Sequence, residues 1–423
     1  MNRRELFAAI AATGLAGAFG TGEALAASDD PATAARDLWF YGLPLIEMAT
    51  TRARHLKAGG RINHLVHSRK LADHTFRAVT TPNNDTLYSM AWLDLSKGPV
   101  TLTVPPMDRY WSAALMDMYT DNDAVLGQRT VGGQGGTFTI VGPGQPGSGD
   151  HTIRATTPHA WLLIRVLTDG GDDLAVTHRV QDGFRLSGPE AASVPAYAER
   201  TAAPADYFAT LTRLLESDPP PATDLRILDR LKTLKVDSPE VAAGVAQAQA
   251  IVRLAKGRQT WTDGWSYTRS NLGDYGQDYL YRAIVALSGL GALPVVEAMY
   301  VRAQGEGSGV FTGDGPHRLT LPAQMPLDGF WSLSMYEQTP DGQLFFTDNP
   351  LHRYAIGDRT PGLKRNADGA LDIWIGRADP GGERTANWLP APKAGPFCLT
   401  IRLYLPRAEV LDGRWRLPAI VAA

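Results

Sequence analysis

Two short segments carry the side chains best suited to chemistry. They are residues 81–89, which read TPNNDTLYS, and residues 116–123, which read MDMYTDND. If the carboxyls of Asp85 and Asp121 meet across a sheet, they form a pair that can supply a general acid and a general base to a glycoside or an amide bond. We therefore predict these two carboxyls as catalytic. Three polar side chains of the same segments are predicted to orient the pair and bind substrate: Asn84, Tyr88 and Tyr119.

The same segments have two simpler interpretations. Asn, Asp and Thr side chains accept hydrogen bonds from nearby backbone groups in turns, so residues 81–89 can serve only to begin a strand. The carboxylates at positions 117, 121 and 123 also suit calcium, which takes about six to eight oxygen ligands. However, their spacing lacks the glycine and the terminal glutamate of an EF-hand loop. We predict no metal site and no cofactor.

The C-terminal part of the chain supplies another kind of candidate, aromatic rings and a guanidinium group. Trp331 and Trp388 can stack on a sugar or an aromatic ligand, and Arg353 can bind a carboxylate with two parallel hydrogen bonds. The core of an ordinary β-sandwich uses the same aromatic side chains. A non-catalytic module that binds a glycan, a lipid or a protein is therefore the alternative to a hydrolase.

Other familiar catalytic and metal-binding motifs do not occur in the sequence. His64, His67 and His74 lie close together but form no His-Glu-x-x-His motif, so surface or capping roles are predicted for them. No Gly-x-Ser-x-Gly nucleophile motif occurs. Cys398 lies in an apolar run, which predicts a buried core residue rather than a nucleophile.

Composition limits the class of protein. With 423 residues, of which 44% are hydrophobic and 20% charged, the chain is long enough for about two or three folded domains. It has 41 Lys and Arg residues and 44 Asp and Glu residues, a net charge of −3, and no basic stripe marks a nucleic-acid surface. We expect no nucleic-acid partner. The single cysteine excludes an internal disulfide, an iron–sulfur cluster and a cysteine-based zinc site.

Residues 1–26 have the order of an export signal. An arginine pair at positions 3 and 4 precedes an apolar stretch and an Ala-Leu-Ala cleavage motif at residues 24–26. The paired arginines predict the twin-arginine export machinery as a partner, with an ordinary Sec signal as the alternative. The apolar stretch is too short to span a bilayer, and no later window is long enough. We predict a periplasmic or secreted protein without a membrane span; its oligomeric state stays open.

The hydrophobic pattern predicts the elements that position these side chains. Residues 31–57 repeat apolar side chains every three or four residues, which predicts a helix. From about residue 78 to 182, short Val, Leu, Ile, Thr and Trp runs between turn residues predict the strands of an antiparallel sandwich. Period-two strand patterns return from about residue 300. Between these regions, helices are predicted at residues 204–215, 224–234, 239–256 and 279–288.

These changes of pattern divide the chain into five segments. They are an export signal (1–26), an N-terminal helical segment (27–77), a first β-sandwich domain (78–188), a helical middle region (189–299) and a C-terminal β-sandwich domain (300–423). The predicted fold class is mainly β with α. Both polar segments, 81–89 and 116–123, fall in the first β domain.

Several stretches resemble a tandem bacterial family whose two halves are known as domains of unknown function 1254 and 1214. Those that look like the first half are Tyr41-Gly42-Leu43-Pro44, residues 82–89, residues 117–122 and Gly142-Pro143-Gly144. Those that look like the second half are residues 330–336, Asn349-Pro350, Arg353-Tyr354, Asp368-Gly369, residues 386–392 and Arg402-Leu403-Tyr404. The resemblance covers nearly all of the chain after residue 26, in the expected order.

This resemblance implies two β-sandwich domains, the second jelly-roll-like, with a helical region between them. The family has no settled activity; similarity of its sandwiches to a glycoamidase-type scaffold suggests a hydrolase, but a shared fold does not carry function. Glu337 stands where the family pattern has Asp. We expect an exported hydrolase of a carbohydrate or an amide-linked polymer that uses Asp85 and Asp121, or else the non-catalytic binding module. A small molecule or a glycan is the expected ligand, and for the binding module a lipid or a protein is the alternative.

Overall fold

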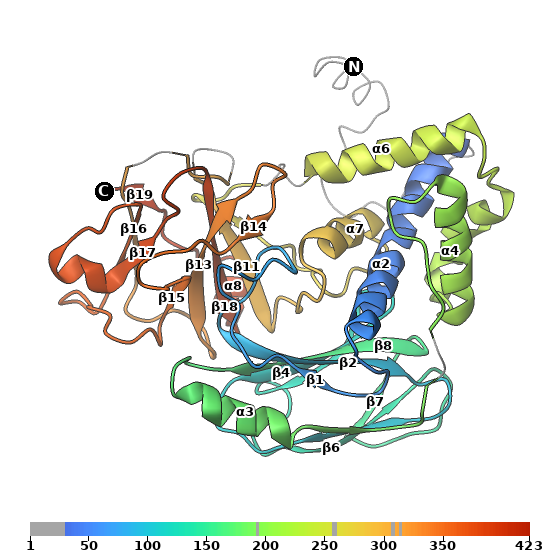
Figure 1. The fold of residues 1–423 in the computed structure, drawn as a ribbon, viewed down its shortest axis with the longest axis horizontal. Coiled ribbons are helices and arrows are strands. Elements are labelled where there is room, and N and C mark those ends of the chain that lie inside the picture. The colour runs from blue at the N-terminus through green and yellow to red at the C-terminus, as the bar shows by residue number, and fades with distance from the viewer. Residues whose placement is uncertain (1–29, 192–193, 256–259, 306–308, 313–314) are drawn as a thin grey trace.

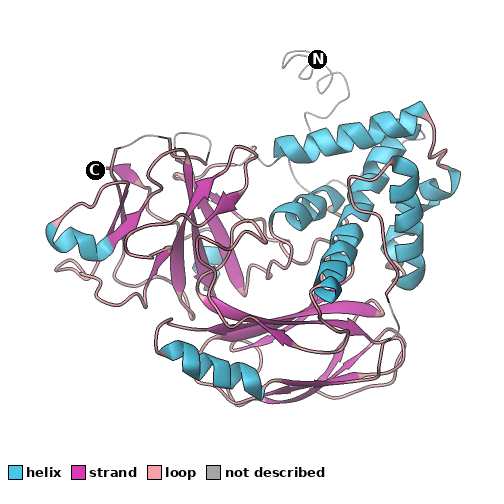
Figure 2. Cartoon of the chain, in the orientation of Figure 1, coloured by secondary structure: helices cyan, strands magenta, loops and turns pink. Residues whose placement is uncertain are grey.

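The computed structural model describes residues 30–191, 194–255, 260–305, 309–312 and 315–423. Two β domains and a layer of helices meet in the middle of the molecule (Figure 1). The strands gather in two separate bodies, and the long helices lie together beside them (Figure 2). The predicted class, mainly β with α, is confirmed. The export signal predicted at residues 1–26 lies outside the described residues.

The first β domain is a sandwich of two sheets. One sheet has the strand order β1-β2-β8-β4-β5 and the other has the order β7-β6-β3-β9. The first sheet consists of β1 (Val66–His67), β2 (Thr86–Asp94), β4 (Trp111–Asp117), β5 (Asn122–Gly127) and β8 (His159–Leu167). The second consists of β3 (Val100–Val104), β6 (Gly136–Val141), β7 (Thr152–Arg154) and β9 (Arg185–Ser187), and helix α3 (Asp173–Gly183) connects β8 to β9.

The central strand of the first sheet, β8, is covered on both faces. Successive side chains of a strand point to opposite faces. Ile164 belongs to the core between the two sheets, whereas Trp161 and Leu163 belong to the core that the helices form on the other face. Every β8 residue after His159 is therefore buried. Arg165 lies on the same face as Trp161 and Leu163, and it is the charged residue of this apolar strand.

The helical layer packs on the outer face of the first sheet. Its long helices are α2 (Pro31–Lys57), α4 (Pro204–Ser217), α6 (Pro239–Ala255) and α7 (Tyr279–Ser288), and its short turns are η2 (Ala222–Asp224), α5 (Leu225–Leu228) and η3 (Asp229–Thr233). Helix α2 begins where the Asp30 carboxylate accepts a hydrogen bond from the Thr33 N–H at 2.9 Å. It runs through the middle of the layer, so every residue from Asp37 to Thr50 is buried.

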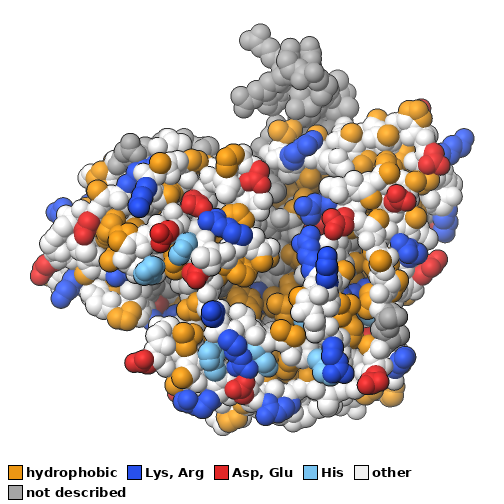
Figure 3. All heavy atoms as spheres, viewed as in Figure 1, with side chains coloured by type: hydrophobic (Ala, Val, Ile, Leu, Met, Phe, Trp, Pro, Cys, Tyr) orange, Lys and Arg blue, Asp and Glu red, His pale blue; other side chains and the backbone are white. Residues whose placement is uncertain are grey.

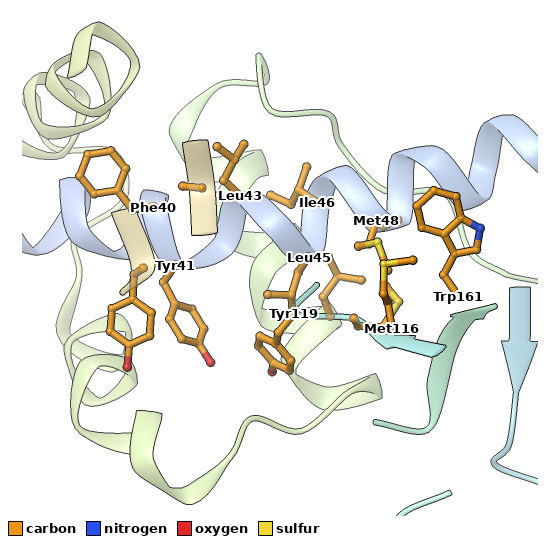
Figure 4. Packing of buried hydrophobic residues seen from close by; sticks show 14 of the residues in the cluster. Phe40, Tyr41, Leu43, Leu45, Ile46, Met48, Met116, Tyr119 and Trp161 are labelled. Atoms are coloured by element: carbon orange, nitrogen blue, oxygen red, sulfur yellow. The ribbon is translucent and has the colours of Figure 1, made fainter. Parts of the chain in front are cut away.

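Side chains of α2 build the main hydrophobic core together with the outer face of the sheet. Met48 lies beside Trp161 of β8 (Figure 4). Trp161 stacks on Trp92 of β2, with ring centres 5.3 Å apart. Nearer the start of α2, the hydroxyl group of Tyr41 points to the same side as that of Tyr119, which follows β4. Both point away from this apolar row (Figure 4). The helix therefore fixes one end of the sheet through apolar contacts.

The C-terminal domain is a second sandwich. One sheet has the order β10-β11-β18-β13-β14, with β15 paired to β13, and the other has the order β17-β16-β12-β19. The first consists of β10 (Trp265–Tyr267), β11 (Ala298–Ala303), β13 (Trp331–Gln338), β14 (Leu344–Phe345), β15 (Ala355–Gly357) and β18 (Phe397–Tyr404). The second consists of β12 (His317–Leu321), β16 (Leu371–Gly376), β17 (Trp388–Pro390) and β19 (Val421–Ala422), with η4 (Gly382–Asn387) and α8 (Ala408–Leu411) in the connections. A hydrophobic core lies between the sheets.

Most of the predicted elements are present. The helices predicted at residues 31–57 and 279–288 are α2 and α7, whereas residues 224–234 form short turns instead of one helix. Helix α3 is missed, because it buries only the polar Thr177 and Gln181 and so shows little apolar periodicity. No helix in the described part of the chain has both the length and the hydrophobicity that a bilayer crossing requires.

Candidate functional site

Asp85 lies at the contact between the two β domains. Its carboxylate accepts a hydrogen bond from the Ser332 hydroxyl of β13 at 2.6 Å, and the Tyr404 hydroxyl of β18 lies 3.5 Å away. Asp85 is 6% exposed. Asn83 holds its turn: the Asn83 side-chain oxygen accepts from the Asp85 N–H at 2.6 Å, and its amide donates to the Tyr404 hydroxyl at 2.8 Å. The segment is thus both an Asx-type turn and an interdomain contact.

Arg402 of β18 fills the space behind this contact. Its guanidinium donates to Ser334 Oγ at 2.7 Å, to the Tyr336 hydroxyl at 2.8 Å and to the Pro82 carbonyl at 3.2 Å. Burial lowers the pKa of Arg402, but the neighbouring oxygens of Tyr336 and Tyr404 outweigh this effect, so the pKa lies above its ordinary value. Hydroxyl and carbonyl oxygens therefore make the direct contacts of this charge, and the negative charge of nearby Asp85 helps to stabilise it.

Arg165 is a second buried guanidinium, on the first domain's side of the contact. It lies opposite Tyr88 in the β2–β8 register, and its Cζ is 5.2 Å from the centre of the Tyr88 ring. Its Nη2 donates to the Gly291 carbonyl at 2.6 Å, whereas no residue in the described ranges accepts a hydrogen bond from its buried Nη1. Burial lowers the pKa of Arg165, but Tyr88 and Tyr300 of β11 outweigh this effect and raise it. In the part of the chain that the structure describes, no carboxylate lies within ion-pair distance of Arg165.

Glu297 is a buried carboxylate beside these arginines. It is fully buried and accepts hydrogen bonds from the Tyr110 hydroxyl and from Arg129 Nε, both at 2.9 Å. Burial raises the pKa of Glu297, and the two hydrogen bonds partly offset the rise. Tyr110 also packs edge-on against Tyr404, with ring centres 5.1 Å apart, so it joins Glu297 to the group around Asp85.

These side chains form what we call the junction cluster, because they connect the two β domains. Its members are Asp85, Tyr88, Tyr110, Arg165, Glu297, Tyr300, Ser332, Arg402 and Tyr404. Most of them are buried, but Tyr88 and Tyr300 are partly exposed. The molecular surface is hollowed where the first β domain, the helical layer and the C-terminal domain meet, and hydrophobic side chains are exposed there (Figure 3).

Part of the first sheet's outer face, on β2, stays partly exposed beside the junction cluster. At one end of that face, helix α2 covers Trp161. At the other end, Phe330 and Tyr404 of the C-terminal domain pack on Tyr110. Tyr88 and Met90, two residues apart on β2, point to the same face and stay partly exposed. The hollow therefore lies between two fixed covers, next to the junction cluster.

Asp121 lies elsewhere, against the helical layer. Its carboxylate forms an ion pair with buried Arg282 of α7 at 2.6 Å and accepts a hydrogen bond from the Tyr275 N–H at 2.7 Å. Asp117 caps the same turn, because it accepts from the backbone N–H groups of Tyr119 at 2.8 Å and of Asp121 at 2.9 Å. Burial raises the pKa of Asp121, and Arg282 offsets part of the rise. This turn anchors the helical layer to the sheet.

The two predicted catalytic carboxyls are not brought together. Asp85 directly precedes β2, whose first residue pairs with Leu167 at one end of β8, whereas Asp117 pairs with Ala160 at the other end. At a rise of about 3.3 Å per residue, the seven steps from Ala160 to Leu167 span about 23 Å. Paired glycosidase carboxyls lie about 5–10 Å apart. The predicted pairing of Asp85 with Asp121 is therefore corrected: the two cannot act on one bond.

The other predicted substrate-binding residues, apart from Tyr88, make contacts within the fold. Asn84 Nδ2 and the Tyr119 hydroxyl donate to backbone carbonyls at 2.6 and 2.8 Å. Trp331 is 4% exposed and lies in the core of the C-terminal sandwich. Trp388 is 5% exposed, and its indole N–H donates to a backbone carbonyl at 2.9 Å. Arg353 donates to two backbone carbonyls of the η4 connection at 2.8 and 2.9 Å. Of the predicted residues, the structure brings Asp85 and Tyr88 to one cluster.

Neither a metal centre nor a surface pocket offers a better candidate among the described residues. Among the described residues, no group of three or more His, Cys, Asp or Glu side chains is arranged to hold a metal ion. A surface pocket in the C-terminal domain contains none of the predicted site residues, and its His317 ring packs edge-on against Phe311. The residues that line it are Gly264, Gln304, Gly305, Phe311, His317, Ile420 and Ala422. The junction cluster and its hollow are therefore the candidate site.

Comparison with known families assigns the two halves of the chain. A model described as a protein of unknown function, DUF1254, matches residues 62–188, and a model described as a protein of unknown function, DUF1214, matches residues 297–408. The chain belongs to the tandem DUF1254–DUF1214 family. Asp85 lies in the DUF1254 domain and Ser332 in the DUF1214 domain, so both domains build the junction cluster.

Two solved structures are similar to this chain. The VPA0106 protein from Vibrio parahaemolyticus has a TM-score of 0.70 and 22% sequence identity, over 93% of this chain and 100% of its own. An uncharacterised protein from Burkholderia cenocepacia has a TM-score of 0.48 and 13% identity, over 94% of this chain and 91% of its own. No curated protein matches the chain. The first of these structures shares the fold.

Sequence reasoning misses several members of the DUF1254–DUF1214 junction. Arg165 gave a usable signal, since it is the charged residue within residues 160–167, which read AWLLIRVL. A charge in the middle of a buried strand requires polar partners or a function. Tyr300 and Ser332 gave no such signal, because their importance depends on how the two domains dock.

Proposed function

We propose that this DUF1254–DUF1214 protein is an exported binding module that holds a small molecule or a glycan in the hollow beside Tyr88. The observation that carries the proposal is the buried guanidinium of Arg165, which lies next to partly exposed tyrosines and donates no hydrogen bond from Nη1 to any described residue. Burying a charge is costly unless it is paired or hydrogen-bonded. A ligand that reaches Tyr88 would complete the surroundings of this charge.

The residues around the hollow supply the chemistry of a ligand site. Such sites combine apolar surface with a few polar groups that fix the ligand's orientation, and they often lie between domains. Met90 and the rings of Tyr88 and Tyr300 provide apolar surface, and the two hydroxyls provide polar groups. Tyr88 comes from the first domain and Tyr300 from the second, so a ligand here would touch both.

Hydrolysis stays a second candidate because of Asp358, which directly follows β15. Its side chain is 31% exposed, and burial together with the nearby negative charge of Asp85 raises its pKa, although Arg359 opposes the rise. Asp358 and Asp85 would then supply the pair of carboxyls that Asp85 and Asp121 do not form. Turnover of glycans or peptidoglycan by the wild type, lost in Asp85→Asn and in Asp358→Asn, would favour this candidate over a binding module.

The binding proposal can be tested with a fragment screen by saturation-transfer NMR. The screen uses the exported chain and two variants that add the same indole at different places. Met90→Trp fills the hollow, whereas Leu254→Trp places the ring at a position of α6 that is 37% exposed. We expect fragments that bind the wild type and Leu254→Trp but not Met90→Trp. No hits on the wild type, or hits that bind Met90→Trp equally well, would count against the proposal.

Export is proposed from the order of residues 1–26 alone. The basic pair at positions 3 and 4, the apolar stretch and the Ala-Leu-Ala motif support it. Replacing both Arg3 and Arg4 by Lys should keep the chain in the cytoplasm if the twin-arginine machinery carries it. Cell fractionation and N-terminal sequencing of the wild type should place the mature protein outside the cytoplasm with a new terminus near Ala27. An uncleaved cytoplasmic wild type would refute export.

A further inference from the structure

The charge of the junction cluster points to the class of ligand. We propose that the hollow binds a carboxylate, and that Arg165 positions the hydroxyls of Tyr88 and Tyr300 to donate hydrogen bonds to its two oxygens. This inference rests on the proposed ligand site in the same hollow. It assigns Arg165 a positioning role and the two tyrosines direct contact with the ligand.

The shielded guanidinium of Arg165 has no adjacent carboxylate among the described residues. Two other shielded guanidiniums pair with carboxylates, Arg109 with Asp173 at 2.7 Å and Arg282 with Asp121 at 2.6 Å, whereas Arg402, like Arg165, has neutral oxygens as its direct partners. Arg165 is 4% exposed, yet its direct contacts are a carbonyl and tyrosines. A monoanion in the hollow would supply the negative charge that the surrounding described residues do not place next to it.

Glu297, a carboxylate whose pKa Arg165 helps to lower, is already occupied by other partners. The Glu297 carboxylate already accepts hydrogen bonds from Arg129, which is positively charged, and from the Tyr110 hydroxyl. Its interaction with Arg165 is weaker than these two contacts. Glu297 therefore reduces the positive potential at the hollow without removing it, which favours a singly charged ligand over a more highly charged one.

The positive charge of Arg165 orients the hydroxyls of Tyr88 and Tyr300. A tyrosine hydroxyl can donate one hydrogen bond and accept others. Beside a guanidinium, which can only donate, the hydroxyl oxygen turns toward the positive charge and the O–H points away from it. Tyr88 stabilises charged Arg165 in this way, and Tyr300 lies close enough to do the same. Two O–H donors from two domains then face the hollow, as donors do in an oxyanion-binding site.

Apolar surface beside Tyr88 can hold the rest of the ligand. Met90 is partly exposed next to Tyr88, and Leu163 lies opposite it in the β2–β8 register. Met90 therefore offers apolar surface beside Tyr88, and buried Leu163 supports it from the neighbouring strand. A carboxylate attached to an apolar or aromatic body matches this order of polar and apolar surface.

The test uses two probes of similar shape, benzoate and benzyl alcohol, with affinities measured by ligand-observed NMR. For the wild type, we expect benzoate to bind at least about tenfold more tightly than benzyl alcohol, as hydrogen bonds to a charged group require. Phenyl phosphate serves as a third probe, and its dianion should bind less tightly than benzoate. Tighter binding of phenyl phosphate would show that the site takes a phosphoryl group and would overturn the carboxylate assignment.

Conservative variants then test the two tyrosines. Tyr88→Phe and Tyr300→Phe should each weaken benzoate about tenfold and leave benzyl alcohol nearly unchanged, because each removes one donor. Tyr197→Phe is a matched control, since Arg213 lies 5.2 Å from the Tyr197 ring centre, the same separation as between Arg165 and Tyr88. It should change neither affinity. A purely structural role of the tyrosines would lower both affinities or neither.

The remaining outcomes separate this inference from the proposed function. Equal affinities for benzoate and benzyl alcohol would overturn the carboxylate inference and leave a ligand site in the hollow. If neither probe binds, but other fragments bind the wild type and not Met90→Trp, the carboxylate inference is again overturned and the ligand site remains. If every fragment that binds the wild type also binds Met90→Trp, both the inference and the proposed function fail.

Discussion

The Ser332 hydroxyl donates a 2.6 Å hydrogen bond to the carboxylate of Asp85, 247 residues earlier in the chain. This contact fixes the turn before β2 to strand β13, so the first domain depends on a side chain of the second. Hydrogen bonds to a charged group are stronger than those between neutral groups, and a buried carboxylate has few other donors to turn to.

Replacing Ser332 by Ala should therefore lower the free energy of unfolding by about 1–3 kcal/mol, because the buried carboxylate of Asp85 loses its shortest hydrogen bond from a side chain. Urea denaturation followed by tryptophan fluorescence measures the change. Ser288→Ala, at the exposed end of α7, is the control and should cost less than about 0.5 kcal/mol. Equal effects of the two substitutions would show that the interdomain contact contributes little.

Asp121→Asn should destabilise the protein by about 3 kcal/mol, because it leaves the Arg282 guanidinium buried without its partner. Asp328→Asn breaks an ion pair of similar length, 2.7 Å, between side chains that are 65% and 53% exposed, and should cost less than about 1 kcal/mol. Thermal and urea denaturation of both variants give the comparison. A loss of less than 1 kcal/mol for Asp121→Asn would mean that the turn does not anchor the helical layer.

Asp123 should make stability depend on pH in the mildly acidic range. Burial raises the pKa of Asp123 to about 6, and hydrogen bonds from Thr156 oppose part of the rise. Because this lies above the ordinary value of 3.8, the folded state binds more protons between about pH 4 and 6, and stability falls as pH rises through that window. Asp123→Asn should make this fall shallower and leave the slope between pH 7 and 8 unchanged, as measured by urea denaturation at stepped pH. An unaltered slope between pH 4 and 6 would disprove the shift.

Trp331→Ala tests whether the aromatic residues of the C-terminal sandwich bind ligand or build its core. Trp331 is 4% exposed within the core, so its truncation should cost about 3–5 kcal/mol of stability. At a temperature where the variant stays folded, fragments that bind the hollow should keep their affinity. Selective loss of those fragments without a loss of stability would return Trp331 to the ligand site.

Local pattern was enough to predict many of the elements. Residues 31–57 and 279–288 repeat apolar side chains at helical spacing, and α2 and α7 follow with the same bounds. Helix α3 escaped because the side chains it buries, Thr177 and Gln181, are polar. The candidate site was less accessible to such reasoning, since Asp85, Ser332 and Tyr300 come together through docking of domains far apart in the sequence.

The interpretation of Asp85 and Asp121 shows where sequence reasoning reaches its limit. Both lie in polar turns of one β domain; Asx-type capping was the alternative interpretation for residues 81–89, whereas the capping role of Asp117 in the second turn was not foreseen. Their separation, however, is set by which end of β8 each turn adjoins, and strand order is a property of the assembled sheet. Residue type alone could not distinguish two ends of one strand from two sides of one cleft.

Both halves of the chain supply contact residues to the junction, so a change of one half affects the other. Arg402, donated by the second half, hydrogen-bonds the Pro82 carbonyl of the first half, and Tyr110 of the first half packs on Tyr404 of the second. Separating the halves onto two polypeptides would remove the Pro82 carbonyl from Arg402, which keeps Ser334 and Tyr336, and would expose aromatic rings on both. A half exchanged by recombination would therefore need a partner that carries the matching contact residues.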